Sequence, residues 1–350
     1  MLVFKIIAYC LVFVAALNVF AFAYNPPVGS QAMFNLSSPT QLSYAASAAG
    51  SGIFNVGPDS IVFNPALTAM EQRIQLDTDY SAIFSTKYSS FNSAFQTGIL
   101  IPYKWLVLSG YLNGTFSSAP EMDLGNSMNL KIGIAKEVSE KISVGMNLAT
   151  GIFWEDKVDW ALGVDLGVLY RRERLGFAKD FRFGVALLNL GKYYTTNLPG
   201  LDENYASDYF PSIATLKLGV GTVLLETKNF NIGASFDITS PTFQNAIFDT
   251  GVQFGVKDTV FLSIAESIDI REVVNGHYNF MPAIGVTVKF MFNSKNNEYL
   301  KAHDWDQSEM ITSAAWQQKY ESLQVVSGGL KLKLGLKDTT PPVIKLWDEE

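Results

Sequence analysis

The sequence lacks most of what a catalytic or metal-binding protein needs. Its 350 residues include one cysteine, Cys10, and two histidines, His277 and His303. Protein zinc sites take three or four side-chain ligands, and a Ser-His-Asp arrangement needs a histidine beside its nucleophile. We find no Gly-x-Ser-x-Gly motif and no phosphate-binding glycine loop followed by lysine. We therefore expect no enzyme activity, no metal site and no cofactor.

Charge is also scarce. Charged residues make up 17% of the chain, against ~25% in an average soluble protein. The net charge is −7 with a pI near 5.0, and no basic cluster stands out, which argues against nucleic-acid binding. Aromatic residues reach 13%, and the mean hydropathy of +0.14 is high.

The first 23 residues have the features of a cleaved export signal. Lys5 precedes an apolar run over 6–20, and Ala21-Phe22-Ala23 supplies the small-x-small pattern of a cleavage site. A membrane anchor is the alternative, because this run could just span a thin bilayer. Polar Tyr24-Asn25 after the site favours cleavage. Cleavage would remove Cys10, leaving neither disulfides nor thiolate ligands.

No second run of ~20 uninterrupted apolar residues follows. An exported chain this apolar, without spanning helices, can satisfy its backbone in lipid as a closed barrel. Apolar residues at 142, 144, 146 and 148 alternate with Ser143, Gly145 and Asn147. We predict that the first set faces lipid and the second faces the lumen. A soluble all-β protein also alternates, but its polar face would carry more Lys and Glu than this one.

The fold class predicted is therefore all-β, a transmembrane antiparallel β-barrel of about 12–14 strands with an N-terminal plug. The strands are expected at 73–84, 91–101, 105–116, 125–136, 141–154, 158–171, 179–192, 211–226, 229–240, 245–256, 259–270 and 278–292. The connectors between these strands are alternately short and long, as expected when short turns lie at one end of a barrel and longer loops at the other. The connector 172–179 is an exception, because it falls at the end with the short turns but is long. The predicted organisation is a signal peptide (1–23), a plug (24–72), a barrel (73–292) and a tail (293–350).

The plug carries a family resemblance. Ala45-Ala-Ser-Ala-Ala-Gly50, Asp59-Ser60 and Asn64-Pro65-Ala66 resemble the N-terminal hatch of FadL-type fatty-acid transporters. That family also includes PorV-like and uncharacterised spirochaetal outer-membrane proteins. An Asn-Pro-Ala element precedes the first strand in these families. Here Pro65 would end the preceding segment, and Asn64 could satisfy backbone groups in a bend. Residues 64–66 thus form the predicted junction of plug and barrel.

The resemblance implies an outer-membrane channel, in a bacterium with two membranes, for passive uptake of hydrophobic compounds such as long-chain fatty acids. We expect Met33, Phe34, Phe54 and Phe63 either to line the route or to pack the plug against the wall. Strand charges in the lumen phase are expected to pair with each other and with the plug, or to line a substrate path. They are Asp77, Asp79, Lys131, Asp165, Arg182, Lys217 and Asp237. Two other functions stay open: a PorV-like anchor for exported partners, and an adhesin-like barrel acting through its outer loops, especially 194–209.

Two features depart from the resemblance, which implies fourteen strands and an end at the last strand. Only twelve strands are predicted, and residues 293–350 follow them. A helix is expected over 303–323 and a strand over 328–336. One interpretation makes 293–325 an outer loop and 328–337 the closing strand. The other, which we favour, makes the whole tail periplasmic, in contact with the barrel rim or a periplasmic partner.

Overall fold

The structure is a computed structural model. It describes residues 36–43, 47–53, 57–85, 91–117, 126–154, 158–192, 214–241, 243, 245–274, 276, 281–294, 297–303, 305–319 and 323–336. The predicted signal peptide lies outside these residues. No helix within the described ranges is long and apolar enough to cross a membrane.

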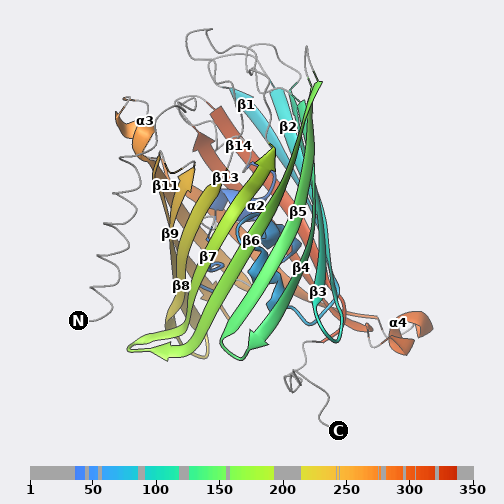
Figure 1. Cartoon of the computed structure of the whole chain (residues 1–350). Coiled ribbons are helices and arrows are strands. Elements are labelled where there is room, and N and C mark those ends of the chain that lie inside the picture. The colour runs from blue at the N-terminus through green and yellow to red at the C-terminus, as the bar shows by residue number, and fades with distance from the viewer. Residues whose placement is uncertain are drawn as a thin grey trace.

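The described residues form one closed antiparallel barrel of fourteen strands (Figure 1). Each strand pairs with its neighbours in the chain, and β1 closes the barrel by pairing with β14. The strands are β1 (Gln75–Ser85), β2 (Phe91–Pro102), β3 (Val107–Ser117), β4 (Asn126–Ser139), β5 (Ile142–Trp154), β6 (Val158–Leu175), β7 (Ala178–Lys192), β8 (Thr215–Glu226), β9 (Phe230–Pro241), β10 (Ile247–Val256), β11 (Val260–Asp269), β12 (Ala283–Asn293), β13 (Gln307–Lys319) and β14 (Leu323–Lys333). All twelve predicted strands are present within a few residues of their expected limits.

The helix predicted over 303–323 is wrong for residues 307–319, which form strand β13 of the wall. The strand predicted over 328–336 is present as β14, which closes the barrel against β1 as one of the two interpretations expected. The favoured interpretation, a tail that is periplasmic throughout, is therefore wrong for β13 and β14. The physical reason is closure: without β14, strand β1 would have an unpaired backbone edge. The register runs from Gln75 opposite Lys333 to Ser85 opposite Leu323. The fourteen strands that the family resemblance implies are thereby confirmed.

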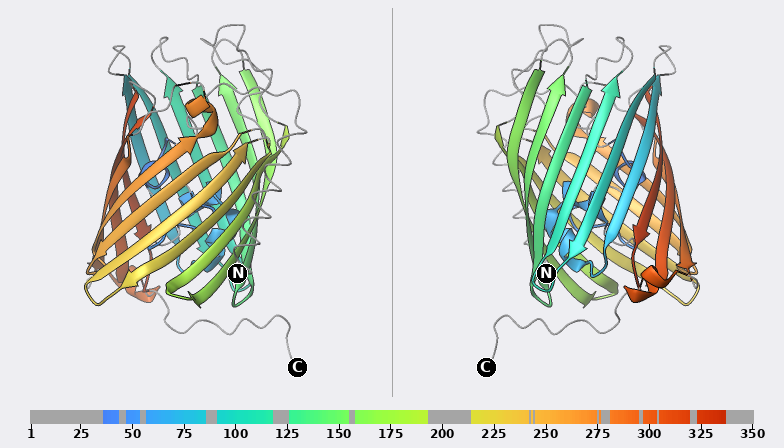
Figure 2. Two further views of the ribbon diagram at one scale, coloured as in Figure 1. Left: turned by 90° about the vertical axis from the view of Figure 1, so that its left-hand side faces the viewer. Right: turned by 90° about the vertical axis from the view of Figure 1, so that its right-hand side faces the viewer.

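The barrel has two different ends. At the turn side, consecutive strands are joined by short turns, as between Ser139 and Ile142, except between β12 and β13. The predicted long connector 172–179 is mostly strand, because β6 runs to Leu175 and β7 begins at Ala178. Gly176, with φ +65°, allows this two-residue turn. The short helix α4 (Glu298–Ala302) also lies at the turn side, whereas α3 (Ile270–Val274) lies at the opposite end, the loop side (Figure 2).

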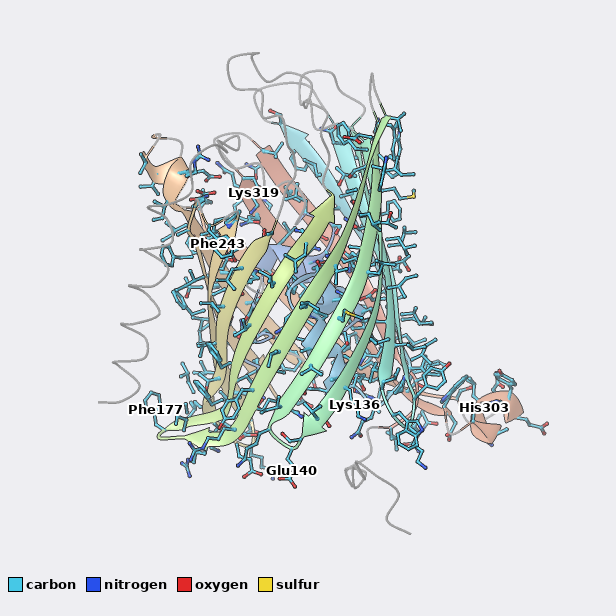
Figure 3. The ribbon with its side chains drawn as sticks, in the orientation of Figure 1. Lys136, Glu140, Phe177, Phe243, His303 and Lys319 are labelled. Atoms are coloured by element: carbon cyan, nitrogen blue, oxygen red, sulfur yellow. The ribbon has the colours of Figure 1, made fainter. Side chains whose placement is uncertain are left out.

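The strands alternate as predicted. On β5, Ile142, Val144, Met146 and Leu148 are exposed on the outer surface, while Ser143 and Asn147 are buried in the lumen. The predicted orientation of both sets is confirmed. The outside of the barrel is consequently covered with apolar side chains, which are drawn as sticks around the wall in Figure 3.

The lumen holds the N-terminal segment (Figures 1 and 2). We call residues 36–43, 47–53 and 57–72 the plug. It contains the short helix α2 (Pro39–Ser43) and the 3-10 helices η2 (Pro58–Val62) and η3 (Pro65–Met70). Proline is favoured at the first position of a helix, where no N–H is needed. Two buried apolar clusters join the plug to the wall, one containing Leu42 and Val325 and the other containing Leu67 and Leu169.

One seam of the wall is shorter than its neighbours. Strands β11 and β12 pair only from Val260 opposite Val288 to Ala265 opposite Ala283. The loop-side end of β11, residues 266–269, therefore extends beyond the start of β12. On the other flank, β13 pairs with β12 only as far as Trp316. The described part of the wall thus has a notch at the loop side between β11 and β13.

Candidate functional site

The plug is seated directly against one side of the lumen. On β7, a Cβ added to Gly184 would lie 1.9 Å from the carbonyl oxygen of Ala48 in the plug. On β5, a Cβ added to Gly145 would lie 2.5 Å from the carbonyl oxygen of Pro65. Glycine is the residue that permits such a close approach of two backbones. The plug is therefore in contact with the wall over β5–β7, with no room for a solute between them.

The predicted junction residues anchor this contact. Asn64 is fully buried, and its Oδ1 accepts a hydrogen bond from the amide of Ala66 at 3.0 Å, which caps η3. Its Nδ2 donates to the carbonyl oxygens of Ala48, at 2.7 Å, and of Val168 on β6, at 3.1 Å. One side chain thus links two parts of the plug to the wall.

The predicted lumen charges lie inside the barrel. Lys131 pairs with Asp165 at 2.6 Å, and Lys217 pairs with Asp237 at 3.4 Å. Asp237 also accepts a hydrogen bond from the plug amide of Ala48 at 2.6 Å.

The remaining predicted charges also reach the plug or its neighbours. Arg182 donates to the carbonyl oxygen of Gly52 at 2.7 Å. Asp77 accepts from the amide of Asp59 at 3.2 Å, and Asp79 accepts from Gln96. Four of the seven therefore contact either the plug backbone or another charge that does. The alternative expectation, that some of these charges line a substrate path, stays a prediction.

A cavity of about 350 Å³ lies on the opposite side of the plug. Its outer wall comes from β11–β14 and its inner wall from the plug. Phe261 and Ile311 of the barrel and Phe63 of the plug supply aromatic and aliphatic surface, among polar neighbours such as Thr287 and Ser313. The volume falls at the lower end of the range for small-molecule sites, roughly 300–1,000 Å³. The site can therefore hold a compact molecule with an apolar body.

Of the four residues predicted to line a route, Phe63 lies at this cavity. Its ring also belongs to the buried plug cluster with Leu67, and the Nζ of Lys217 lies 5.4 Å from its centroid. Both roles expected for Phe63, lining and packing, are compatible with this position. Met33, Phe34 and Phe54 lie outside the described residues.

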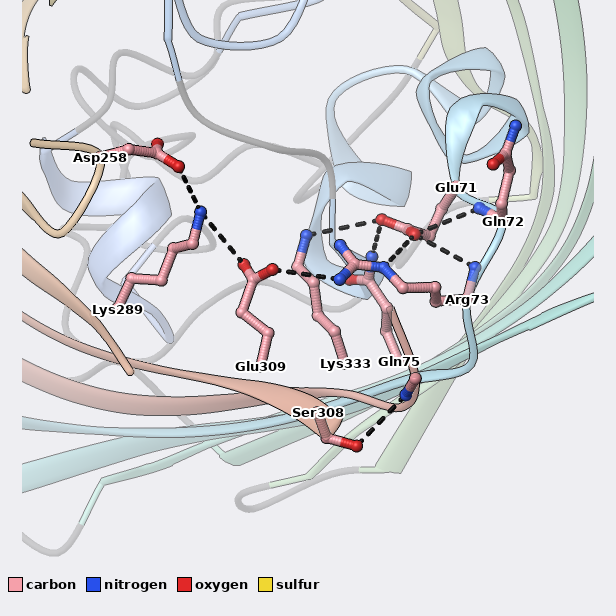
Figure 4. Close-up of polar contacts among 10 residues, drawn as sticks. Glu71, Gln72, Arg73, Gln75, Asp258, Lys289, Ser308, Glu309 and Lys333 are labelled. Atoms are coloured by element: carbon pink, nitrogen blue, oxygen red, sulfur yellow. Dashed lines mark hydrogen bonds and ion pairs between the residues drawn. The ribbon is translucent and has the colours of Figure 1, made fainter. Parts of the chain in front are cut away.

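A chain of ion pairs crosses the turn-side end of the cavity (Figure 4). Lys289 of β12 lies 2.7 Å from Asp258 in the β10–β11 turn and 3.9 Å from Glu309 of β13. Glu309 in turn holds Arg73 at 3.0 Å, and Arg73 lies 3.2 Å from Glu71 at the end of the plug. Lys333 of β14 completes the chain, 3.4 Å from Glu71. A solute leaving at this end would have to pass these paired charges.

A further ion pair lies on the same side. Lys331 of β14 lies 3.0 Å from Asp59 of the plug, and both residues line the cavity. Within the described ranges, no group of three or more His, Cys, Asp and Glu side chains is arranged to hold a metal ion. The charged groups around the cavity are thus arranged as ion pairs, and Lys331–Asp59 joins the wall to the plug.

No protein-family profile and no curated protein sequence matches this chain. Solved structures do. The monoaromatic hydrocarbon channel CymD has a TM-score of 0.52 at 11% identity, over 91% of this chain and 100% of CymD. The deltaS2S3 mutant of the monoaromatic hydrocarbon channel TodX has a TM-score of 0.53 at 9% identity, over 85% of this chain and 99% of the mutant. This chain has the fold of these hydrocarbon channels. The toluene transporter TodX of Pseudomonas putida itself has a TM-score of 0.48 at 10% identity, over 86% of this chain and 100% of TodX.

Several of the charged residues near the cavity belong to the segment that the sequence analysis assigns to the tail. Glu309, Lys331 and Lys333 were placed in the tail, so they were not considered as lumen residues. A signal was present, because Leu330 and Leu332 alternate with Lys331 and Lys333 as they should in a wall strand. The sequence pattern predicts a strand from Arg73, whereas β1 begins at Gln75.

Proposed function

We propose that this protein is an outer-membrane channel for the passive uptake of small hydrophobic molecules. The cavity beside Phe63, Phe261 and Ile311 carries the proposal. It supplies apolar side chains, among polar ones, inside a barrel whose outer face is apolar. CymD and TodX, which share the fold, are monoaromatic hydrocarbon channels. In this arrangement the turn side faces the periplasm and the loop side faces the outside, as is usual for such barrels.

The proposed route runs along β11–β14. On the β5–β7 side, the wall glycines and Asn64 hold the plug in direct contact with the barrel. Movement of a solute there would require the whole plug to leave. On the β11–β14 side the cavity already exists, so passage needs only local changes in the side chains that close it.

Long-chain fatty acids are the finer proposal, and the charges at the cavity bear on it. Arg73, Lys289 and Lys331 are each paired with a carboxylate. A fatty-acid carboxylate would have to displace Glu309, Asp258 or Asp59 from these cations. Since removing one partner of a buried pair such as Arg73–Glu309 or Lys331–Asp59 is costly, this arrangement favours neutral molecules, including a fatty acid in its protonated form.

Uptake of the neutral probe N-phenylnaphthylamine tests the proposal, because intact lipopolysaccharide slows its entry into cells. We expect cells that make the protein to take up the probe faster than cells that do not. Replacing Ser313, which lines the cavity, with tryptophan should abolish the gain, while Ser313→Ala at the same position should retain it. A dansyl-labelled fatty acid tests the finer proposal in the same cells.

Membrane insertion without any probe uptake would contradict the proposal. That outcome is expected of a PorV-like anchor or an adhesin-like barrel, neither of which needs a solute to cross the barrel.

A further inference from the structure

The hairpin of β12 and β13 extends past the turn-side rim of the barrel. The first residue of β11, Val260, pairs with Val288 of β12, so residues 289–293 continue beyond the β10–β11 turn. They stay paired with β13 as far as Asn293 opposite Gln307. Because the strands are tilted, this extension carries α4 away from the wall, to the lower right in Figure 1. In Figure 3, His303 lies sideways from the barrel at about the height of Phe177, whereas Glu140 lies lower.

The connection at the tip of this hairpin is a fixed structure. Asn297 caps α4, its side chain accepting hydrogen bonds from the amides of Tyr299 and Leu300 at 3.0 and 3.2 Å. The Nδ1 of His303 lies 2.8 Å from the carbonyl oxygen of Tyr299, and the amide of Trp305 donates to Leu300 at 2.8 Å. These hydrogen bonds fix the described residues Tyr299, Leu300, His303 and Trp305 relative to one another.

These constraints gather three rings. The centroids of Tyr299 and His303 lie 4.4 Å apart, those of His303 and Trp305 lie 5.0 Å apart, and those of Tyr299 and Trp305 lie 6.4 Å apart. Tyr299 is 63% exposed even though its ring contacts both neighbours. We call Tyr299, His303 and Trp305 the ring cluster. Each ring combines an apolar body with a polar atom, a combination that suits the boundary between lipid and water.

The ring cluster continues an apolar surface of the wall. Phe290, Met291 and Phe292, on the extended part of β12, are exposed at 46%, 58% and 48%. They connect the apolar outer face of the barrel with α4. An exposed surface of this composition, displaced sideways at the level of the strand ends, meets the edge of a bilayer before it meets anything in the aqueous space.

We propose that α4 and the ring cluster lie in the headgroup region of the periplasmic leaflet and bind phospholipid there. The proposal rests on the outer-membrane location in the proposed function. The three rings and the aromatic end of β12 sit at the lipid–water boundary, and the capped helix keeps them in that plane. The hairpin thereby holds the turn-side ends of β12 and β13, which close the cavity, at a fixed depth.

Labelling at single cysteines tests this proposal. In a Cys10→Ser background, Tyr299→Cys, Leu148→Cys and Glu140→Cys each place one thiol for an environment-sensitive NBD dye. The full chain is reconstituted in phosphatidylethanolamine–phosphatidylglycerol vesicles, and heat-modified migration on gels checks that each variant is folded. We expect NBD at 299 to be quenched by headgroup nitroxide lipids, at 148 by deep acyl nitroxides, and at 140 only by an aqueous quencher.

The three positions separate the two proposals. If the dye at 148 reports lipid while the dye at 299 behaves like that at 140, the anchor is wrong and α4 projects into the periplasm. If the dye at 148 is aqueous in the folded protein, the membrane location itself is wrong. The rings are tested with a dye at Lys301→Cys, which should lose its headgroup quenching when Tyr299→Ala, His303→Ala and Trp305→Ala are combined. Retained quenching in that variant would overturn their role.

Discussion

The Nζ of Lys331 lies 3.0 Å from the Oδ1 of Asp59, so the last strand of the barrel holds the plug that precedes the first strand. Asp59 is 2% exposed, and the carboxylates of Asp77 and Asp79 lie close enough to act on the same lysine. Lys331 is thus the ion-pair partner of the buried Asp59 inside the lumen.

Replacement of this lysine should destabilise the protein. In Lys331→Met the buried Asp59 loses its ion-pair partner, and breaking a buried pair in this way costs about 3–5 kcal/mol. We expect a decrease of that order in the free energy of unfolding, measured by urea titration in lipid vesicles. The matched control is Lys179→Met, because its pair with Glu226 is exposed on both sides and an exposed pair contributes at most about 1 kcal/mol. Equal losses in the two variants would show that Lys331 does not hold the plug.

Gly184 provides a test of the close contact between the plug and β7. The Cβ of Gly184→Ala would lie 1.9 Å from the carbonyl oxygen of Ala48, so the plug has to move away from β7. Overpacking of this kind costs about 1–3 kcal/mol, and we expect faster proteolysis of the plug as well as lower stability. Gly328→Ala is the control, since an added Cβ there meets nothing within 4 Å. Unchanged proteolysis in Gly184→Ala would contradict the close contact.

The strands of the wall could be predicted from the sequence because the alternation of apolar and polar residues is a local pattern. The alternation of Ile142 with Ser143, and of Met146 with Asn147, depends only on which side each residue faces. The rule failed at β13, where Ile311, Ala315 and Trp316 also fit a helical spacing. Only closure of the barrel decides between these two periods, and closure is a property of the whole chain.

The contacts of the site were less accessible to prediction. The carboxylate of Asp237 accepts from the amide of Ala48, 189 residues away, and every residue type except proline has such an amide. Nothing in the sequence distinguishes Gly184 at a close contact from a glycine facing open space. The alternation along the strand predicts that Asp237 faces the lumen, but the group that it binds depends on how the plug folds.

Lys289 joins the exposed Asp258 to the ion-pair chain at the cavity. In Lys289→Met, the turn residue Asp258 loses its partner, while Glu309 keeps Arg73. The turn-side end of the cavity should then open more easily, and we expect faster uptake of N-phenylnaphthylamine than in the unmodified protein. Lys179→Met, distant from the cavity, should leave the rate unchanged. A slower rate in Lys289→Met would mean that the chain assists passage instead of closing it.

Helix α3 should respond to pH. Burial, and secondly the neighbouring Asp269, raise the pKa of Glu272 to about 7, although Lys319 acts in the opposite sense. Between the ordinary value of 4.5 and about 7, packed α3 retains a proton that a free loop would release. Packing is therefore strongest at low pH, weakens as the pH rises through this window, and changes no further above it.

Hydrogen exchange of α3, corrected for its intrinsic pH dependence, measures this effect at one pH below the window and one above it. We expect less protection at the higher pH in the unmodified protein. Glu272→Gln cannot ionise, so its protection should be the same at both values. A pH dependence that persists in Glu272→Gln would assign the effect to another group.

The position of Leu148 tests the membrane-facing surface. It is 54% exposed at the middle of β5, where the proposed function places the centre of the bilayer. A charge at that depth costs about 2–4 kcal/mol and a charge near the interface about 0–1 kcal/mol. We therefore expect Leu148→Arg to lower the free energy of unfolding in vesicles far more than Phe177→Arg, in the turn between β6 and β7. Both positions are exposed, so a water-facing surface would give two equally small losses. That result would exclude the bilayer as the environment of β5.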